Sequence, residues 1–390
     1  MGSFGLTGYH DEPKTKGPGL TVGRRSASFG VVNYCPVDYW PLNTALDVTD
    51  FHGNDERFAY YLLKTIDFTA YNSGSAQPSL NRNFIHPLRI RVPAPNEQRR
   101  IANILGTLDD KIELNRRMNE TLEAMARRLF KSWFIDFDPV HAKAALRREH
   151  PKLSNADLSR RALPNMAPEI AEPFPDSFED ATLGAIPEGW KVSAIGDMVT
   201  AVGGATPSTT EPSFWDGDTP FATPKDLAGL ASPVLLSTER RITQAGVERI
   251  SSGVLPTGTV LLSSRAPIGY LAIAEIPVAV NQGFVAMICD RGVPNHYILH
   301  WAKENLETIV GHANGTTFPE ISKKNFRPIA AIAPDESITK QFQSIAGEFH
   351  RQLVTNVRES LRLATVRDKL LPRLLSGELS VESSMEVYDA

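Results

Sequence analysis

The sequence lacks most features of secreted, membrane-bound or metal-binding proteins. Its two cysteines, Cys35 and Cys289, cannot form a structural zinc site by themselves and favour a reducing, cytoplasmic setting. No stretch approaches the roughly 18 consecutive apolar residues of a membrane-spanning helix, and no apolar signal segment follows Met1. No H-x-x-H or C-x-x-C grouping occurs. We therefore expect no membrane span, no metal site and no cofactor.

A surplus of positive charge is also absent. The chain has 41 Lys and Arg against 45 Asp and Glu, a formal net charge of −4. A protein that holds DNA by itself and without sequence preference is normally basic, so the composition counts against that class. The composition is compatible with a chain that reads DNA within an assembly whose other subunits contact the phosphates.

Motifs of nucleotide and DNA chemistry are missing as well. There is no G-x-x-x-x-G-K-[ST] phosphate loop, and no glycine-rich cofactor turn with the Asn/Asp-Pro-Pro-aromatic tetrapeptide of adenine methyltransferases. The stretch "PDESITK" (334–340) resembles the acid-acid-lysine pattern of some nucleases. It opens a long helix, however, and is duplicated as "PAPNEQ" (93–98), which indicates a structural role. We expect no catalytic residues.

What the chain does contain is a long apolar repeat. Alternating steps of four and three residues from Ile101 give a seam that is mostly apolar and ends at Trp133: Ile101, Leu105, Leu108, Ile112, Asn115, Asn119, Leu122, Ala126, Leu129 and Trp133. The 33 residues from Ile101 to Trp133 correspond to about 50 Å of helix. A single apolar stripe can pack on any core, but this length favours a coiled coil.

The same seam recurs 241 residues later, starting at Phe342, with Asn356 in the place of Asn115. Three further segments echo at nearly the same offset: "NRNFIHPLRIRVPAPNEQ" (81–98) lines up with "KKNFRPIAAIAPDESITKQ" (323–341), "SGSAQPSL" (73–80) with "ANGTTFPEI" (313–321), and "SASFGVV" (26–32) with "RAPIGYL" (265–271). The chain is therefore a tandem duplication of a mixed domain followed by a long helix.

The two helices are expected to pair antiparallel as a coiled coil. Asn115 and Asn356 either fix its register or are merely tolerated. The predicted interface positions are Ile101, Leu105, Leu108, Ile112, Asn115, Leu122 and Leu129 on the first helix, and Phe342, Phe349, Leu353, Asn356, Leu363 and Leu370 on the second.

Three stretches carry a resemblance to one family: "PAPNEQRRIANILGTLDDKIELNRRMNETLEAMARRLFKSWFIDFDPV" (93–140), "PFPDSFEDATLGAIPEGWKV" (173–192) and "RDKLLPRLLSGELSV" (367–381). Over nearly its whole length the chain resembles the specificity subunit of type I restriction-modification enzymes. The resemblance implies two target-recognition domains separated by long helices, and no chemistry of the subunit's own. It also implies that the chain reads a bipartite double-stranded DNA target and that methylation subunits, two of them, and restriction subunits dock on it in phage defence.

The expected fold class is α+β, with two target-recognition domains of mixed strands and helices joined by a long antiparallel two-helix coiled coil. The expected segments are a first recognition domain (1–94), a first long helix (95–140), an extended linker (141–186), a second recognition domain (187–335), a second long helix (336–376) and a flexible tail (377–390).

The first recognition domain is expected to be partial. In the second copy, "GGATPS" (203–208) and "FWDGDTPFATPKDL" (214–227) precede "TVLLSSRAPIG" (259–269). The matching "TVGRRSASFG" already begins at Thr21, so roughly 50 residues have no counterpart, among them any Pro-Glu-Gly-Trp entry like that at 187–190.

Candidate DNA contacts are basic and amide residues in loops, because Arg, Lys, Asn and Gln read base edges, while Lys, Arg, Ser and Thr hold phosphates. Each could equally be an ordinary surface residue. The candidates in the second domain are Lys225, Arg265, Asn314, Thr316, Thr317, Lys323 and Lys324, and those in the first are Arg24, Arg25, Ser75 and Gln77.

Other functions remain open at this point. A nuclease or methyltransferase in its own right would bind S-adenosylmethionine or modify DNA unaided. A truncated, non-functional or regulatory coiled-coil remnant would show no sequence preference even with methylation subunits present.

Overall fold

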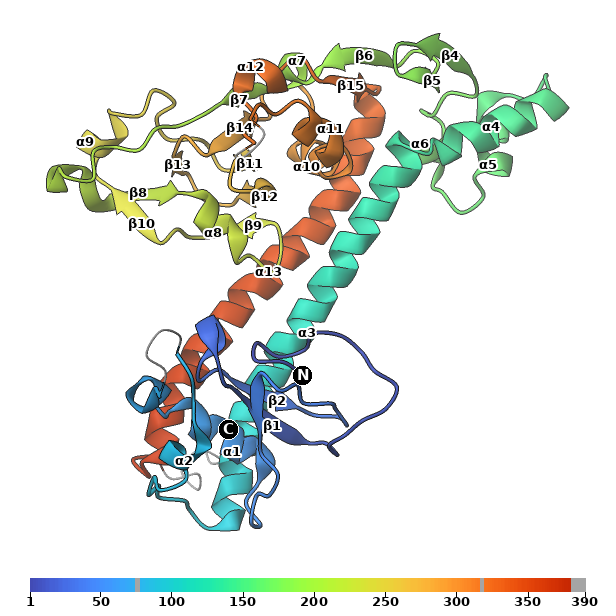
Figure 1. Cartoon of the computed structure of the whole chain (residues 1–390). Coiled ribbons are helices and arrows are strands. Elements are labelled where there is room, and N and C mark those ends of the chain that lie inside the picture. The colour runs from blue at the N-terminus through green and yellow to red at the C-terminus, as the bar shows by residue number, and fades with distance from the viewer. Residues whose placement is uncertain (74–77, 316–318, 380–390) are drawn as a thin grey trace, which may run out of the picture. The chain divides into compact units, whose positions relative to one another are not determined.

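The computed structural model describes residues 1–73, 78–315 and 319–379 (Figure 1). Contacts divide the chain into two compact units. The first unit consists of Met1–Asn115 and the chain from Arg358 on, and the second of Arg116–Val357. Each unit contains one segment of each of the two long helices. Within the described ranges, no helix combines the length and the apolarity needed to cross a bilayer.

The long helices are α3 (Pro95–Phe134) and α13 (Glu336–Leu375), each 40 residues long. In the first unit, the start of α3 packs on the end of α13, where Ile101 and Leu105 share a cluster with Leu374. In the second unit, the end of α3 packs on the start of α13, where the rings of Phe134 and Phe342 are 5.3 Å apart. The two helices therefore pair antiparallel, and the predicted α+β class with this pairing is confirmed.

The positions of the predicted seam turn inward in both units. Those that are fully or nearly buried include Ile101, Leu105, Asn115, Phe342, Leu353 and Asn356, and those that are half-buried include Leu108, Ile112, Leu122, Leu129, Phe349, Leu363 and Leu370. Two apolar residues off the seam, Leu114 (52%) and Leu361 (54%), are exposed. Phe130 and Val354 also lie off the seam but are buried, because they pack on residues of the second unit's domain. Burial thus follows the four-three spacing except where a domain covers a further side of the helix.

Polar side chains join the two helices within each unit. In the second unit, the buried Asn356 donates from Nδ2 to Oδ1 of Asn119 at 2.9 Å. In the first unit, Asn115 Nδ2 donates to Glu359 Oε2 at 2.8 Å, and Arg367 Nη1 donates to Asp109 Oδ1 at 2.5 Å. Such bonds form in one alignment only, because a slip of one residue separates the partners.

The second unit is built on a five-stranded sheet of order β7-β14-β11-β12-β9. Its strands are β7 (Thr200–Val202), β9 (Val234–Leu235), β11 (Val260–Ser264), β12 (Ile268–Ala274) and β14 (Phe284–Ile288). Every residue of β11 is buried, as befits a central strand. Helix α10 (Asn295–Glu304) packs on β11 and β12, and α11 (Leu306–Gly311) follows it. The core extends to the end of α3 and the start of α13 through Phe130, Phe134 and Phe342.

A second sheet and several short elements complete this unit. The sheet has the order β10-β8-β13, with β8 (Trp215–Ala222), β10 (Arg240–Ile242) and β13 (Ala279–Val280). The short elements are β6 (Lys191–Ala194) paired with β15 (Ala330–Ala333), and α7 (Ile195–Met198), η3 (Pro212–Phe214), α8 (Pro224–Ala228), α9 (Gln244–Val247) and α12 (Lys323–Phe326).

The first unit repeats the centre of this architecture. Strand β1 (Gly19–Gly23) lies between β2 (Val32–Cys35) and β3 (Ala45–Asp47), both antiparallel to it, as β11 lies between β12 and β14. Helix α1 (Glu56–Lys64) follows β3 as α10 follows β14. The short elements η1 (Ser26–Ser28), η2 (Phe68–Tyr71) and α2 (Arg82–Ile85) complete the unit. The predicted duplication is therefore present in the strand order.

The segment between the duplicated parts differs from the extended chain that the sequence predicted. It forms α4 (Asp138–Glu149), α5 (Asn155–Ala162), α6 (Pro168–Ala171) and a hairpin of β4 (Phe178–Ala181) and β5 (Gly184–Pro187). Lys143 of α4 is fully buried and donates from Nζ to Asn155 Oδ1 at 2.9 Å and to the carbonyls of Ala171, Glu172 and Phe174. The Lys143 side chain thus connects α4 to α5, to the last residue of α6 and to the chain that follows α6.

Candidate nucleic-acid interface

The second unit brings several predicted DNA contacts to neighbouring segments. Ser264 N donates to Gly283 O at 2.8 Å, and Ile321 N donates to Ser264 O at 3.0 Å, so that the loops after β11 and before β14 and α12 adjoin. Gly204 joins them, since a Cβ there would overlap Val280 O. Loops arranged in this way on a rigid sheet are where binding residues are usually found.

Arg265 and Asn314 lie on either side of one short segment. Arg265 pairs with Glu320 across an isolated bridge, and its Nη1 is 3.6 Å from Glu320 Oε2. Asn314 N donates to Glu320 O at 3.0 Å, and Glu320 N donates back to Asn314 O at 2.9 Å. The Arg265 side chain is 39% exposed. It lines a pocket of about 580 Å³ together with Pro267, Ile268 and Val310.

The predicted lysines are exposed and lie on helices α8 and α12. Lys323 and Lys324 open α12, and the Lys323 side chain lies over Gly203, whose Cβ would be 2.6 Å from Nζ. Lys225 in α8 is 77% exposed and contacts Glu239 Oε2 at 2.7 Å, which raises the lysine's pKa. Its neighbour Pro224 packs against Gly283. Thr316 and Thr317 lie outside the described residues.

The predicted DNA contacts in the first unit differ in how exposed they are to solvent. Arg25 is exposed and pairs with Ser79 across an isolated bridge. Arg24 is half-buried, and its Nε is buried without a hydrogen-bond partner among the described residues. Arg25 is thus the better placed of the two to reach a ligand. Ser75 and Gln77 lie outside the described residues.

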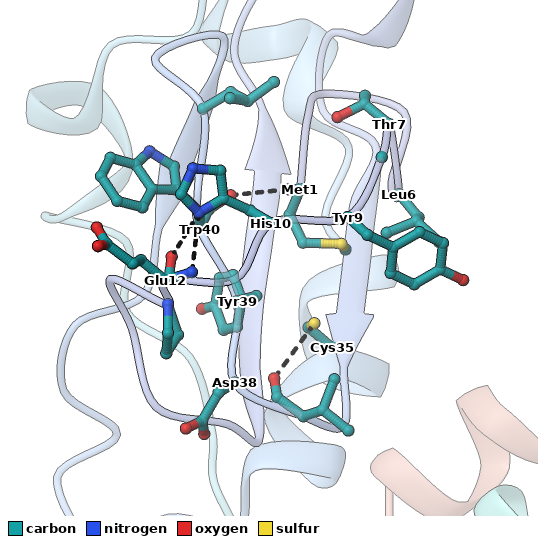
Figure 2. Close-up of a pocket in the computed structure, with 14 residues that line it drawn as sticks. Met1, Leu6, Thr7, Tyr9, His10, Glu12, Cys35, Asp38, Tyr39 and Trp40 are labelled. Atoms are coloured by element: carbon teal, nitrogen blue, oxygen red, sulfur yellow. Dashed lines mark hydrogen bonds between the residues drawn. The ribbon is translucent and has the colours of Figure 1, made fainter.

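The first unit also has a surface hollow of about 400 Å³ (Figure 2). The Met1 amino group donates to Trp40 O at 2.8 Å, and the rings of His10 and Trp40 are 5.3 Å apart. Figure 2 shows His10 lying against Trp40, while Cys35 donates from Sγ to Val37 O at 3.4 Å. Burial raises the pKa of the Cys35 thiol, so this group is not an activated nucleophile.

Buried histidines of the second unit serve packing. His296 and His300 of α10 are 7% and 4% exposed, and His296 Nδ1 lies 2.8 Å from Gln343 Oε1 of α13. Burial lowers the pKa of His296 to about 4 and that of His300 to about 3, so both are neutral at pH 7. Within the part of the chain that the structure describes, no group of His, Cys, Asp and Glu could hold a metal ion.

Two further polar residues at these loops were not predicted. Gln282 is exposed and accepts from Thr206 Oγ1 at 2.7 Å, which links the loop before β14 to the "GGATPS" segment. Arg82 opens α2 where Lys323 opens α12. Aligning the two copies would have found Arg82, whereas the contact of Gln282 depends on strand pairing.

Comparisons with known proteins identify the family of the chain. The family model of the type I restriction modification DNA specificity domain matches residues 2–124 and 187–358, more than half of the chain. The match begins at residue 2 and does not show the predicted loss of part of the first recognition domain, which stays a prediction.

Similar proteins carry the same description. The chain is 28% identical over 355 residues to the specificity subunit of the type I restriction enzyme HindI of Haemophilus influenzae, covering 83% of this chain and 77% of that one. It is 37% identical over 177 residues to the MjaIX specificity subunit of Methanocaldococcus jannaschii, covering 44% and 40%.

A solved structure supports the fold. It is the type I restriction-modification S subunit from M. genitalium, with a TM-score of 0.53, 16% identity, and coverage of 94% of this chain and 85% of that one. The match to the family model establishes the identity. The chain belongs to the type I restriction-modification DNA specificity family and is a DNA specificity subunit, the non-catalytic member of a complex that binds DNA.

Proposed function

We propose that the chain reads a bipartite double-stranded DNA target, one part with each recognition domain, and that α3 and α13 set the spacing between the parts. The main observation that supports this proposal is the duplication, in which each domain with a β-sheet is followed by a 40-residue helix. The domains proposed are those predicted from the sequence, with recognition domains at 1–94 and 187–335. A helix of this length rises about 60 Å, which exceeds the 34–36 Å between half-sites one turn apart.

The proposed DNA contacts are the exposed cations and amides of the loops. In the second domain these are Lys225, Arg265, Asn314 and Lys323, which lie on adjoining segments. In the first domain it is Arg25. Phosphate and base contacts both require such donors at an exposed edge.

The proposed partners are two methylation subunits, docked on the long helices, and restriction subunits, all acting in the cytoplasm. Met125 on α3 and Val366 on α13 are 47% and 45% exposed. They lie 30 residues from the starts of their helices, at Pro95 and Glu336, and are therefore equivalent positions. Exposed apolar residues repeated on two helices are suited to two copies of one partner.

Insertion into both helices tests the spacing. Three heptads in each helix add about 31 Å while preserving the seam, close to one 34 Å turn of duplex DNA. The variant, assayed by binding-site selection with methylation subunits present, should recover the same two half-sites with about nine more base pairs between them. One heptad adds about 10 Å but turns the far half-site by roughly 100°, so it should bind more weakly.

Two outcomes would contradict the proposal. Recovery of the parental spacing by the three-heptad variant would show that the helices do not set the distance. The absence of any sequence preference in the unmodified chain would favour a regulatory or non-functional remnant.

A further inference from the structure

The two recognition domains share one backbone arrangement at the predicted interface. In the first, Arg25 pairs with Ser79, and Leu80 N donates to Arg24 O at 2.8 Å. In the second, Arg265 pairs with Glu320, and Ile321 N donates to Ser264 O at 3.0 Å. The hydrogen bond between Ser73 N and Ser79 O, at 2.9 Å, repeats as the bond between Asn314 N and Glu320 O, at 3.0 Å.

This correspondence puts Arg25 and Arg265 at the same place in the two domains. Leu80 and Ile321 are 0% and 1% exposed, so each points into its core. Neighbouring residues of an extended chain point to opposite faces. The arginines, paired with the residues just before these leucine and isoleucine positions, therefore point outward.

We propose that Arg25 and Arg265 are equivalent phosphate anchors, one for each half-site, which fix each domain on the duplex without reading its sequence. This inference rests on the proposed bipartite reading. The loops of the two domains differ in sequence, as "SGSAQPSL" (73–80) and "ANGTTFPEI" (313–321) show, so we expect them to read different bases. A contact repeated at one backbone position in both domains then serves both half-sites only if it is indifferent to the bases. Contacts to phosphate have that property.

A second pair of cations fits the same assignment. Arg82 and Lys323 occupy the first positions of α2 and α12, directly after the paired segments. Both positions carry a positive charge, although the side chain is arginine in the first domain and lysine in the second. A phosphate accepts either residue, because it requires charge rather than one donor geometry.

Glu320 makes the two anchors unequal. Its carboxylate lies 3.6 Å from Arg265 Nη1, whereas Ser79 stands at this place in the first domain. The guanidinium has five donors, so it can serve Glu320 and a phosphate at once. The carboxylate also repels the phosphate, so Arg265 is the weaker anchor.

The test uses the full chain with methylation subunits present, in a binding-site selection from a random duplex pool followed by titrations of the recovered duplex at several salt concentrations. R25A and R265A should recover the same consensus as the unmodified chain. R25A should weaken binding about tenfold at low salt, and R265A should weaken it by a smaller factor because Glu320 already offsets part of the charge of Arg265. Each variant should reduce the slope of log K against log salt by about 1.

The matched controls are R148A and R160A, which remove one exposed arginine from α4 and α5 and should leave the slope unchanged. Exchanging the neighbours supplies a second readout. E320S should strengthen binding by about 2–5-fold and S79E should weaken it by a similar factor.

Three results would overturn the inference. A changed base preference in R25A or R265A would make that arginine a base contact, and an unchanged salt slope would remove it from the interface. If the control variants changed the salt slope by the same amount, the effect of R25A and R265A would come from the change in net charge and not from a phosphate contact. If the unmodified chain yields no consensus, bipartite reading fails, but the salt slopes on random duplex still decide whether the arginines contact phosphate.

Discussion

His296 and His300 couple the stability of the second unit to pH. Both are buried, and burial lowers their pKa values to about 4 and about 3, against 6.5 for an unfolded histidine. Below pH 6.5 the unfolded chain takes up protons that the folded chain does not. The stability contributed by neutral histidines is therefore present above about pH 6.5 and is lost as the pH falls towards the folded values.

This linkage predicts a loss of up to about 2 kcal/mol for each histidine at pH 5 relative to pH 7.5. Replacing His300 by Phe, which suits a position beside Phe130 and Phe342, should flatten the dependence of the melting temperature on pH. F130L, a replacement without a titratable group in the same cluster, provides the control, since it should lower the melting temperature but keep its dependence on pH. Parallel melting profiles for H300F and the unmodified chain would contradict the linkage.

The sequence echo placed some individual side chains one position away from where the fold has them. The letters Asn-Phe recur at 83–84 and 325–326, which would pair Phe84 with Phe326. In the structure, the capped turns α2 and α12 align Ile85 with Phe326 instead. Phe84 is 53% exposed, whereas Ile85 packs in the first unit's core. Which residues are structurally equivalent depends on which side chain is buried, and a match of residue types between the two copies does not show this.

The two long helices were predictable because a four-three apolar spacing has few other uses. The second ends at Leu375, beside the predicted residue 376, but the first ends at Phe134 and not at 140, because the backbone turns at Phe137, with φ 52°, before α4 begins. The fold of the segment between the copies could not be predicted. Its composition, rich in Pro, Asp, Glu and Ala, indicated an extended chain, but Pro168 occupies the first turn of α6, where a missing N–H costs nothing. At the interface, exposed cations were predictable as residue types. The pairing of Arg265 with Glu320, 55 residues apart, arises from tertiary structure.

The Asn119–Asn356 bond within the helix pair predicts strong coupling in a double-mutant cycle. N356L alone leaves the buried Asn119 carbonyl without its donor from Asn356, at a cost of about 1–3 kcal/mol. The double variant N119L/N356L replaces both amides by apolar groups and should be at least as stable as the unmodified chain. Denaturant unfolding of the four proteins measures the coupling. Additive effects of the two substitutions would mean that the amides act independently.

The division into two units predicts unequal behaviour of fragments. Residues 116–357 are contiguous and contain both partners of the aromatic cluster around Phe134 and Phe342. This fragment should unfold cooperatively by near-ultraviolet circular dichroism. Residues 1–115 lack the end of α13, and without Leu374 the cluster around Ile101 and Phe58 is uncovered, so this fragment should show no cooperative transition. The reverse pattern would mean that the contact division does not follow folding.

The antiparallel pairing of two helices of equal length has a consequence for shorter chains. A polypeptide with one sensing domain and one such helix would leave the apolar side of that helix uncovered. A second copy of the same polypeptide can cover it in the opposite direction, because antiparallel pairing of like helices is symmetric. The product would be a twofold dimer that presents the same sensing domain twice.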